Sequence, residues 1–113
     1  MLKDLFIWQD LKELHTYVLT CLAHYPKSER FTLGQRTQDS VLKMAELTVR
    51  ANAAREKGAL IDDIAVELEV FRFLVDTALS MRVLSVKQHE QIAEHTVKLG
   101  RLLGGWRRKF SDD

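Results

Sequence analysis

The sequence has little proline, glycine or cysteine, and each shortage narrows the range of possible folds. Pro26 is the only proline and there are five glycines among 113 residues, so few positions interrupt a helix. Leucine, alanine, glutamate, lysine and arginine are frequent instead, and these residues favour helix. Cys21 is the only cysteine, which excludes an internal disulfide bond and fits a reducing compartment. We therefore expect an all-α protein.

The sequence also lacks a long apolar run. No stretch approaches the roughly 18 apolar residues needed to span a bilayer. Lys3, Asp4, Asp10 and Lys12 make the first residues too charged for a signal peptide. We therefore predict a cytoplasmic protein without a membrane partner.

Neither sign of charge dominates, because the seventeen lysines and arginines nearly balance the sixteen acids and the net charge is +1. The distribution along the chain is more informative. Residues 26–58 and 85–113 carry an excess of bases, whereas residues 59–84 carry an excess of acids. Any attraction to nucleic acid must therefore be local.

The most informative stretch runs from Ser85 to Trp106. Ser85 and Gln88 have the spacing of a capping box, which marks the start of a helix. Six residues after this start are spaced alternately by four and three, so they form one stripe on a single helical face: Ile92, Thr96, Leu99, Leu103, Trp106 and Phe110. Gly104 and Gly105 are poor residues for a helix interior. They either end the helix or allow another backbone to approach closely.

Similar patterns predict four helices over residues 5–24, 32–57, 61–82 and 85–109, within one domain that spans residues 1–113. Pro26 ends the first helix, because a residue before proline avoids helical angles. Gly58 is expected to stop the second helix. The third helix has a continuous apolar stripe formed by Ile64, Leu68, Phe71, Val75 and Ala78. Short links make neighbouring helices antiparallel, so we predict an up-down-up-down four-helix bundle.

Residue patterns typical of catalysis or metal binding are missing. His89 and His95 are six residues apart, which does not match the His-Glu-x-x-His spacing of zinc proteases. A di-iron bundle needs Glu-x-x-His on two helices, and no such pair occurs. There is also no nucleophile elbow and no phosphate-binding glycine loop. We predict no catalytic residue, no metal site, no cofactor and no small-molecule substrate.

Arg36, Lys43, Arg50 and Lys57 recur every seven residues and so line one side of the second helix. Such a row suits contact with a phosphate backbone. The alternative is a solvated face, because Asp39 and Glu46 lie four residues before Lys43 and Arg50, in the favourable order for ion pairs within a helix. From the residues alone, we favour the solvated face by about two to one.

A second basic group follows in the last helix. Lys98 and Arg101 precede Trp106, and Arg107, Arg108 and Lys109 come directly after it. Cations beside an aromatic ring suit nucleic acid, but cations also stabilise the C-terminal end of a helix. Trp106 itself continues the apolar stripe, which favours a place in the core or in an interface over a base-stacking role.

Arg72 and Phe73 lie where the third helix is apolar on more than one side. Surplus apolar surface on a small bundle is typical of an oligomer interface. We therefore predict that Arg72, Phe73 and Trp106 contribute to contacts between copies, with Arg72 paired to a carboxylate of a neighbouring copy or lining a shared channel.

Several segments, in this order and spacing, resemble the accessory variability determinant (Avd) proteins of diversity-generating retroelements. They are residues 25–34 (YPKSERFTLG), 68–74 (LEVFRFL), 84–85 (LS) and 99–106 (LGRLLGGW). The chain equally resembles the wider four-helix-bundle family that includes proteins encoded in 23S ribosomal RNA intervening sequences. The resemblance covers about residues 17–108.

The resemblance implies a bundle that assembles into a barrel-like homopentamer with a basic surface or channel and without enzymatic activity. In the retroelement branch, the protein binds the reverse transcriptase and the structured template RNA, and supports mutagenic complementary-DNA synthesis (mutagenic retrohoming). The basic character of the family would map onto Arg36, Lys43, Arg50, Arg72, Arg101, Arg107 and Arg108. Retroelement members are typically strongly basic, and this chain departs from that pattern with its nearly balanced charge.

Two readings of function follow. The first is a non-enzymatic, oligomeric accessory protein that binds RNA and a reverse transcriptase. The second is a protein-interaction module of the intervening-sequence type, with a protein partner and no role with nucleic acid, as favoured by the near-neutral charge and the acidic third helix. No ligand or nucleophile spacing supports an enzyme with a site in the bundle core.

Overall fold

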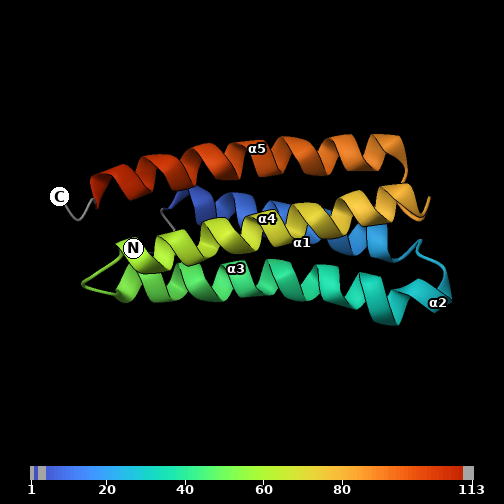
Figure 1. Ribbon diagram of the computed structural model, residues 1–113, viewed down its shortest axis with the longest axis horizontal. Coiled ribbons are helices and arrows are strands. Elements are labelled where there is room, and N and C mark those ends of the chain that lie inside the picture. The colour runs from blue at the N-terminus through green and yellow to red at the C-terminus, as the bar shows by residue number, and fades with distance from the viewer. Residues whose placement is uncertain (1, 3–4, 111–113) are drawn as a thin grey trace.

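The computed structural model describes residues 2 and 5–110, and long helices account for most of them (Figure 1). The elements in chain order are α1 (Phe6–Leu22), α2 (Lys27–Glu29), the π-helical turn η2 (Arg30–Gly34), α3 (Gln35–Ala53), α4 (Gly58–Ser80) and α5 (Val86–Lys109). No strand occurs in these ranges. The predicted all-α class is therefore confirmed for the part of the chain that the structure describes.

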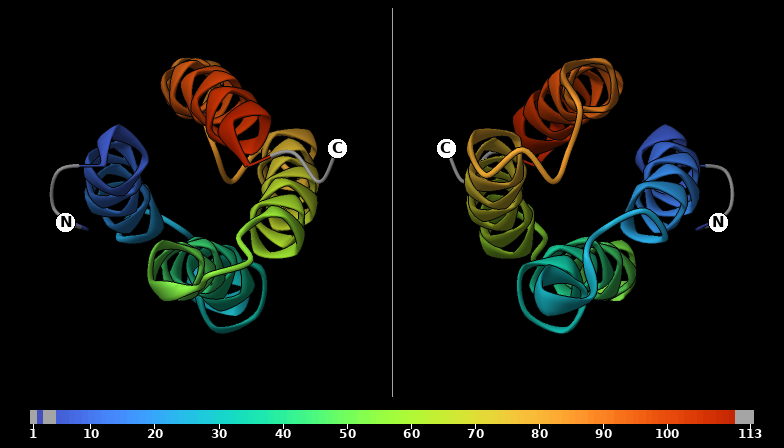
Figure 2. Two further views of the ribbon diagram at one scale, coloured as in Figure 1. Left: turned by 90° about the vertical axis from the view of Figure 1, so that its left-hand side faces the viewer. Right: turned by 90° about the vertical axis from the view of Figure 1, so that its right-hand side faces the viewer.

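Four long helices form an elongated bundle that measures 46 × 21 × 20 Å. Successive long helices run in opposite directions (Figure 1). Viewed along the bundle, α1, α3, α4 and α5 occupy four corners in that order (Figure 2). Helix α1 thus lies beside both α3 and α5, whereas α3 and α5 are diagonally opposite. The up-down-up-down arrangement follows from the short links after α3 and α4.

The core consists of the stripes that periodicity predicts. On α4, Ile64, Leu68, Phe71, Val75 and Ala78 are all buried. On α5, Ile92, Thr96, Leu99 and Leu103 are buried, whereas Trp106 is partly buried against the core and Phe110 lies outside it. The predicted capping box of α5 is also present. The backbone N–H of Gln88 donates to Ser85 Oγ at 3.1 Å, and the backbone N–H of Ser85 donates to Gln88 Oε1 at 3.0 Å.

The boundaries around α3 differ from the expected ones. Helical structure begins at Lys27 rather than Thr32, because α2 and the π-helical turn lead into α3. At the other end, Gly58 does not stop α3 but is the first residue of α4. Gly58 is buried, and a Cβ atom there would lie 2.9 Å from Nη1 of Arg107. The glycine therefore allows the guanidinium of α5 to approach the start of α4.

The paired glycines of α5 also behave differently from both expectations. Gly104 and Gly105 lie inside a helix that continues to Lys109. A Cβ atom at either glycine would meet Arg108 first, at 3.5 and 3.8 Å, and no backbone from another described segment lies as near. Both glycines are half-buried, and α5 continues through them despite the low helix propensity of glycine.

None of the described helices is both long enough and apolar enough to cross a membrane.

Helix α4 ends in a Schellman motif. The N–H of Val83 donates to Ala78 O at 3.0 Å, and the N–H of Arg82 donates to Leu79 O at 3.0 Å. This pattern places Arg82 at the left-handed position, where its φ is 62°. A side chain with a Cβ atom is unfavourable there, because the Cβ crowds the following carbonyl oxygen.

We expect Arg82→Gly to raise the free energy of unfolding by about 0.5–1 kcal/mol, because glycine adopts a positive φ without this crowding. Arg82→Ala is the matched control, since it removes the same charge and keeps the Cβ atom. Urea denaturation followed by circular dichroism measures both. Equal stability of the glycine and alanine variants would show that the left-handed position carries no strain.

Candidate functional site

The three basic residues of α3 lie on its exposed face, but two of them are paired. Glu46 forms ion pairs with Lys43 at 3.5 Å and with Arg50 at 3.1 Å. The hydrogen bond from Arg50, together with both positive charges, lowers the pKa of the Glu46 carboxyl. Asp39 instead accepts from Gln35 Nε2 at 2.9 Å. Of the two intrahelical pairs weighed from the sequence, the one between Glu46 and Arg50 is therefore present.

Lys57, the fourth residue of the predicted stripe, is directed into the protein. Its ammonium group donates to three carbonyl oxygens at the end of α3, those of Ala51, Asn52 and Ala54, at 2.9, 2.9 and 2.7 Å. It also lies 5.6 Å from the centre of the Phe110 ring. These carbonyls lie in the last turn of α3 and just beyond it, where carbonyls lack a full set of helical partners, so Lys57 caps α3 and its charge is favourable to the helix dipole.

The basic side chains of α5 lie in two different environments. Arg107 bridges helices, because its Nε donates to Asp62 Oδ1 of α4 at 2.9 Å and its Nη1 donates to Phe110 O at 2.8 Å. Arg101 and Lys109 instead line a groove of about 260 Å³ between the start of α1 and the end of α5. The groove is otherwise lined by Leu5, Phe6, Ile7, Leu102, Gly105 and Trp106. We call this the Trp106 groove.

The basic residues predicted to bind nucleic acid do not form one continuous surface. Helices α3 and α5 are at diagonal corners of the bundle, so the exposed sides of the two helices face in opposite directions (Figure 2). The two groups meet only at the end of the bundle where α3 and α5 both terminate (Figure 1). There, Lys57 lies against Phe110, and Arg107 lies against Gly58.

The three residues predicted to form an oligomer interface also differ in their exposure and contacts. Arg72 forms an ion pair with Glu69 on its own helix and donates from Nη2 to Thr96 O of α5 at 3.0 Å, so its guanidinium is already used within one chain. Phe73, its neighbour, is 71% exposed. Trp106 is partly buried and contributes to the Trp106 groove. An apolar contact at Phe73 is therefore open to a partner, whereas Arg72 mainly joins α4 to α5.

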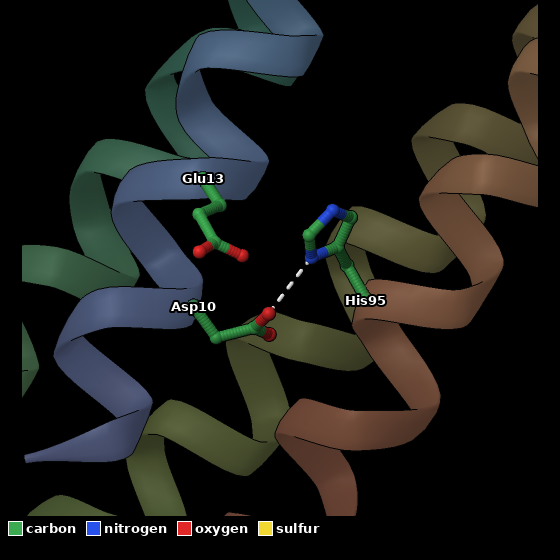
Figure 3. Close-up of side chains that lie close together, drawn as sticks. All are labelled: Asp10, Glu13 and His95. Carbon is green, nitrogen blue, oxygen red and sulfur yellow. Dashed lines mark hydrogen bonds and ion pairs between the residues drawn. The ribbon is translucent and has the colours of Figure 1, made fainter.

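One polar cluster was not anticipated from the sequence. Asp10 of α1 is 1% exposed, and its Oδ1 lies 2.8 Å from Nδ1 of His95 on α5. Glu13 lies one turn further along α1 and points toward the same space (Figure 3). Lys98 is 3.9 Å from Asp10 Oδ1. The signal in the sequence is that Asp10 falls on the apolar face of α1, between Ile7 and Leu14.

Groups that often act in catalysis have other roles among the described residues. Cys21 is buried, and burial raises the pKa of its thiol, which disfavours the nucleophilic thiolate. Burial likewise raises the pKa of the Tyr25 hydroxyl to about 12. His89 pairs with Asp76 at 2.7 Å and His95 pairs with Asp10. Within the part of the chain described, no histidine is hydrogen-bonded to a hydroxyl or thiol nucleophile.

These features define an all-helical bundle protein with basic groups at one end and an exposed apolar side chain on α4. The chain belongs to the bAvd-like family, whose model matches residues 5–110. The resemblance to Avd proteins is thereby confirmed, and this family is of an accessory, non-catalytic kind. No curated protein matches the chain.

The position of Lys57 leads to a prediction about stability. Lys57→Met keeps much of the apolar stem but leaves three carbonyl oxygens without their charged donor, so the free energy of unfolding should fall by about 1–3 kcal/mol. Lys43→Met is the matched control, and we expect a change within about 0.5 kcal/mol, because an exposed ion pair contributes little. Chemical denaturation measures both variants. Equal effects of the two substitutions would contradict a capping role for Lys57.

Proposed function

We propose that this protein is a non-enzymatic, oligomeric accessory protein of a diversity-generating retroelement. In this role it binds the reverse transcriptase and structured RNA of the element and supports mutagenic complementary-DNA synthesis. Membership of the bAvd-like family over residues 5–110 is the observation that carries the proposal. The protein acts by holding these macromolecules together, and the proposal assigns it no catalytic residue and no cofactor.

The RNA contact is proposed to centre on the Trp106 groove. Arg101 and Lys109 supply positive charge at this groove, and such charge attracts the phosphates of RNA. Arg36 and Arg108 are exposed and, among the described residues, make no ion pair, so both can approach phosphates. Lys43, Arg50, Lys57 and Arg107 already hold partners and contribute less.

The expected salt dependence of RNA binding is modest, because few of the cations are unpaired. The logarithm of the association constant falls linearly with the logarithm of the salt concentration. The magnitude of this slope is about 0.7 for each phosphate of a single strand that the protein neutralises. Arg101→Gln combined with Lys109→Gln should therefore reduce the slope by about 1.4 and weaken binding. Fluorescence anisotropy of labelled, structured template RNA across a salt series measures this effect.

Lys43→Gln combined with Arg50→Gln is the matched control for that experiment. It also removes two charges, but both cations already form ion pairs with Glu46, whose single negative charge offsets one of them, so the loss of affinity should be smaller. A larger loss in this control would move the contact from the Trp106 groove to α3. Absence of salt-sensitive binding by the unaltered protein, together with no association with the purified reverse transcriptase, would contradict the retroelement role.

Assembly into an oligomer is proposed to use the outer face of α4. Val66 and Phe73 are 65% and 71% exposed and lie seven residues apart, with the half-buried Val70 between them. This spacing forms a second apolar stripe on a helix whose other side is in the core. Such exposure is unfavourable in water and is relieved when another apolar surface covers it. The resemblance implies that five copies assemble.

We expect Phe73→Ser to lower the mass of the assembly without reducing helicity, because Phe73 contributes nothing to the core of its own chain. Light scattering measures the mass and circular dichroism measures helicity. Met81→Ser is the control, since Met81 is also exposed but lies beyond the end of α4. An unchanged mass for the Phe73 variant would place the interface elsewhere.

The second candidate is a protein-interaction module of the 23S ribosomal RNA intervening-sequence type, with no contact to nucleic acid. The same exposed apolar stripe favours it, because apolar surface recognises proteins rather than phosphates. Charge reversal at Arg101 and Lys109 in the Trp106 groove discriminates between the candidates. An RNA-binding protein loses affinity for its partner, whereas a protein scaffold that uses α4 retains it.

A further inference from the structure

The cluster of Asp10, Glu13 and His95 contains a buried carboxylate that is only half satisfied. Oδ1 of Asp10 pairs with His95, but Oδ2 is buried and has no hydrogen-bond partner among the residues described. A buried ionised carboxylate is costly unless both oxygens are compensated. The residues described therefore compensate the buried Asp10 carboxylate only in part.

Glu13 completes a set of three potential metal ligands from two helices. One carboxylate oxygen of Asp10, one of Glu13 and a ring nitrogen of His95 all lie within 4.8 Å of one another. Asp10 and Glu13 are three residues apart on α1, which places them on the same face. The three side chains converge on one space between α1 and α5 (Figure 3).

We propose that Asp10, Glu13 and His95 bind one divalent transition-metal ion, with Zn²⁺ as the best match. One imidazole and two carboxylates form a donor set that suits zinc, whereas Ca²⁺ and Mg²⁺ prefer six or more oxygen ligands. Zinc bonds of about 2.0–2.2 Å place tetrahedral ligands roughly 3.3 Å apart. Asp10 and His95 need only a small separation from 2.8 Å, and the exposed Glu13 has room to rotate inward.

Lys98 is a positive group that opposes a cation at this position. Its Nζ lies 3.9 Å from Asp10 Oδ1, and its side chain is 52% exposed. The ammonium group is therefore able to withdraw into solvent when the ion binds. Because repulsion between the two cations reduces affinity, removal of the Lys98 charge should tighten metal binding.

The bound ion would join α1 to α5, the first and last helices of the bundle. Ligands from both helices are available together only in the folded state, so the ion stabilises the fold by mass action. We expect saturating Zn²⁺ to raise the Tm by roughly 5–10 °C. This inference concerns the isolated chain and is independent of any RNA or reverse transcriptase.

The test is calorimetric titration of ZnCl₂ into the purified chain, without a histidine tag and after treatment with a chelator, with the Tm measured in parallel. We expect one ion per chain. Glu13→Gln should weaken binding by at least about tenfold, since even outer partners of metal ligands contribute that much. His95→Gln should abolish the Tm increase, and Lys98→Gln should strengthen binding.

Two controls locate the ion. Glu94→Gln removes an exposed acid next to His95 and should leave the affinity unchanged. His89→Gln removes the other histidine that faces an aspartate, Asp76, and should also have no effect. The proposal is overturned if no saturable binding occurs below about 100 μM Zn²⁺, which corresponds to a very weak site. It is equally overturned if Glu13→Gln, which leaves the buried groups in place, retains full affinity.

Discussion

The bundle depends on the packing of α1 against α5. Each of the other neighbouring pairs of long helices is consecutive in the chain, so the connecting segments hold them near each other. Helices α1 and α5 lie at opposite ends of the sequence, so contacts between their side chains close the bundle. Leu14 and Val18 of α1 and Ile92 and Leu99 of α5 are almost fully buried, and each such side chain stabilises the fold by about 1.5–3 kcal/mol. The pair of Asp10 and His95 crosses the same seam and adds a polar contact between the two helices.

Charge is used in two ways in this protein. Lys57, Arg72 and Arg107 lie where helices end or meet, and each is bound to carbonyl or carboxylate oxygens of its own chain. Arg36, Arg101, Arg108 and Lys109 remain on the surface. A count of basic residues therefore overstates the surface charge that a partner meets. The family relationship and the Trp106 groove are better guides to a binding face than the total charge is.

Much of the fold follows from short-range patterns. The stripe on α4 and the capping box of α5 were predictable, because a helical period and a spacing of three residues are fixed by local geometry. The start of α4 was not, because a glycine such as Gly58 serves equally at the end of one helix or the beginning of the next, and its close approach to Arg107 is a tertiary contact that no local pattern contains. The role of Lys57 and the meeting of Asp10 with His95 depend on tertiary packing. No local spacing relates positions 10 and 95, so only the folded chain brings those two side chains together.

The diagonal placement of α3 and α5 constrains the path of any bound strand (Figure 2). A straight strand passing along one side of a single copy meets the cations of one helix and leaves those of the other on the far side. To touch both, it must bend around the bundle, for example at the end of the rod where Lys57 and Phe110 lie together. A flexible single strand makes such a turn at little cost, whereas a stiff duplex does not. If the chain binds RNA as proposed, the geometry of one copy favours looped or single-stranded segments over long helical stems.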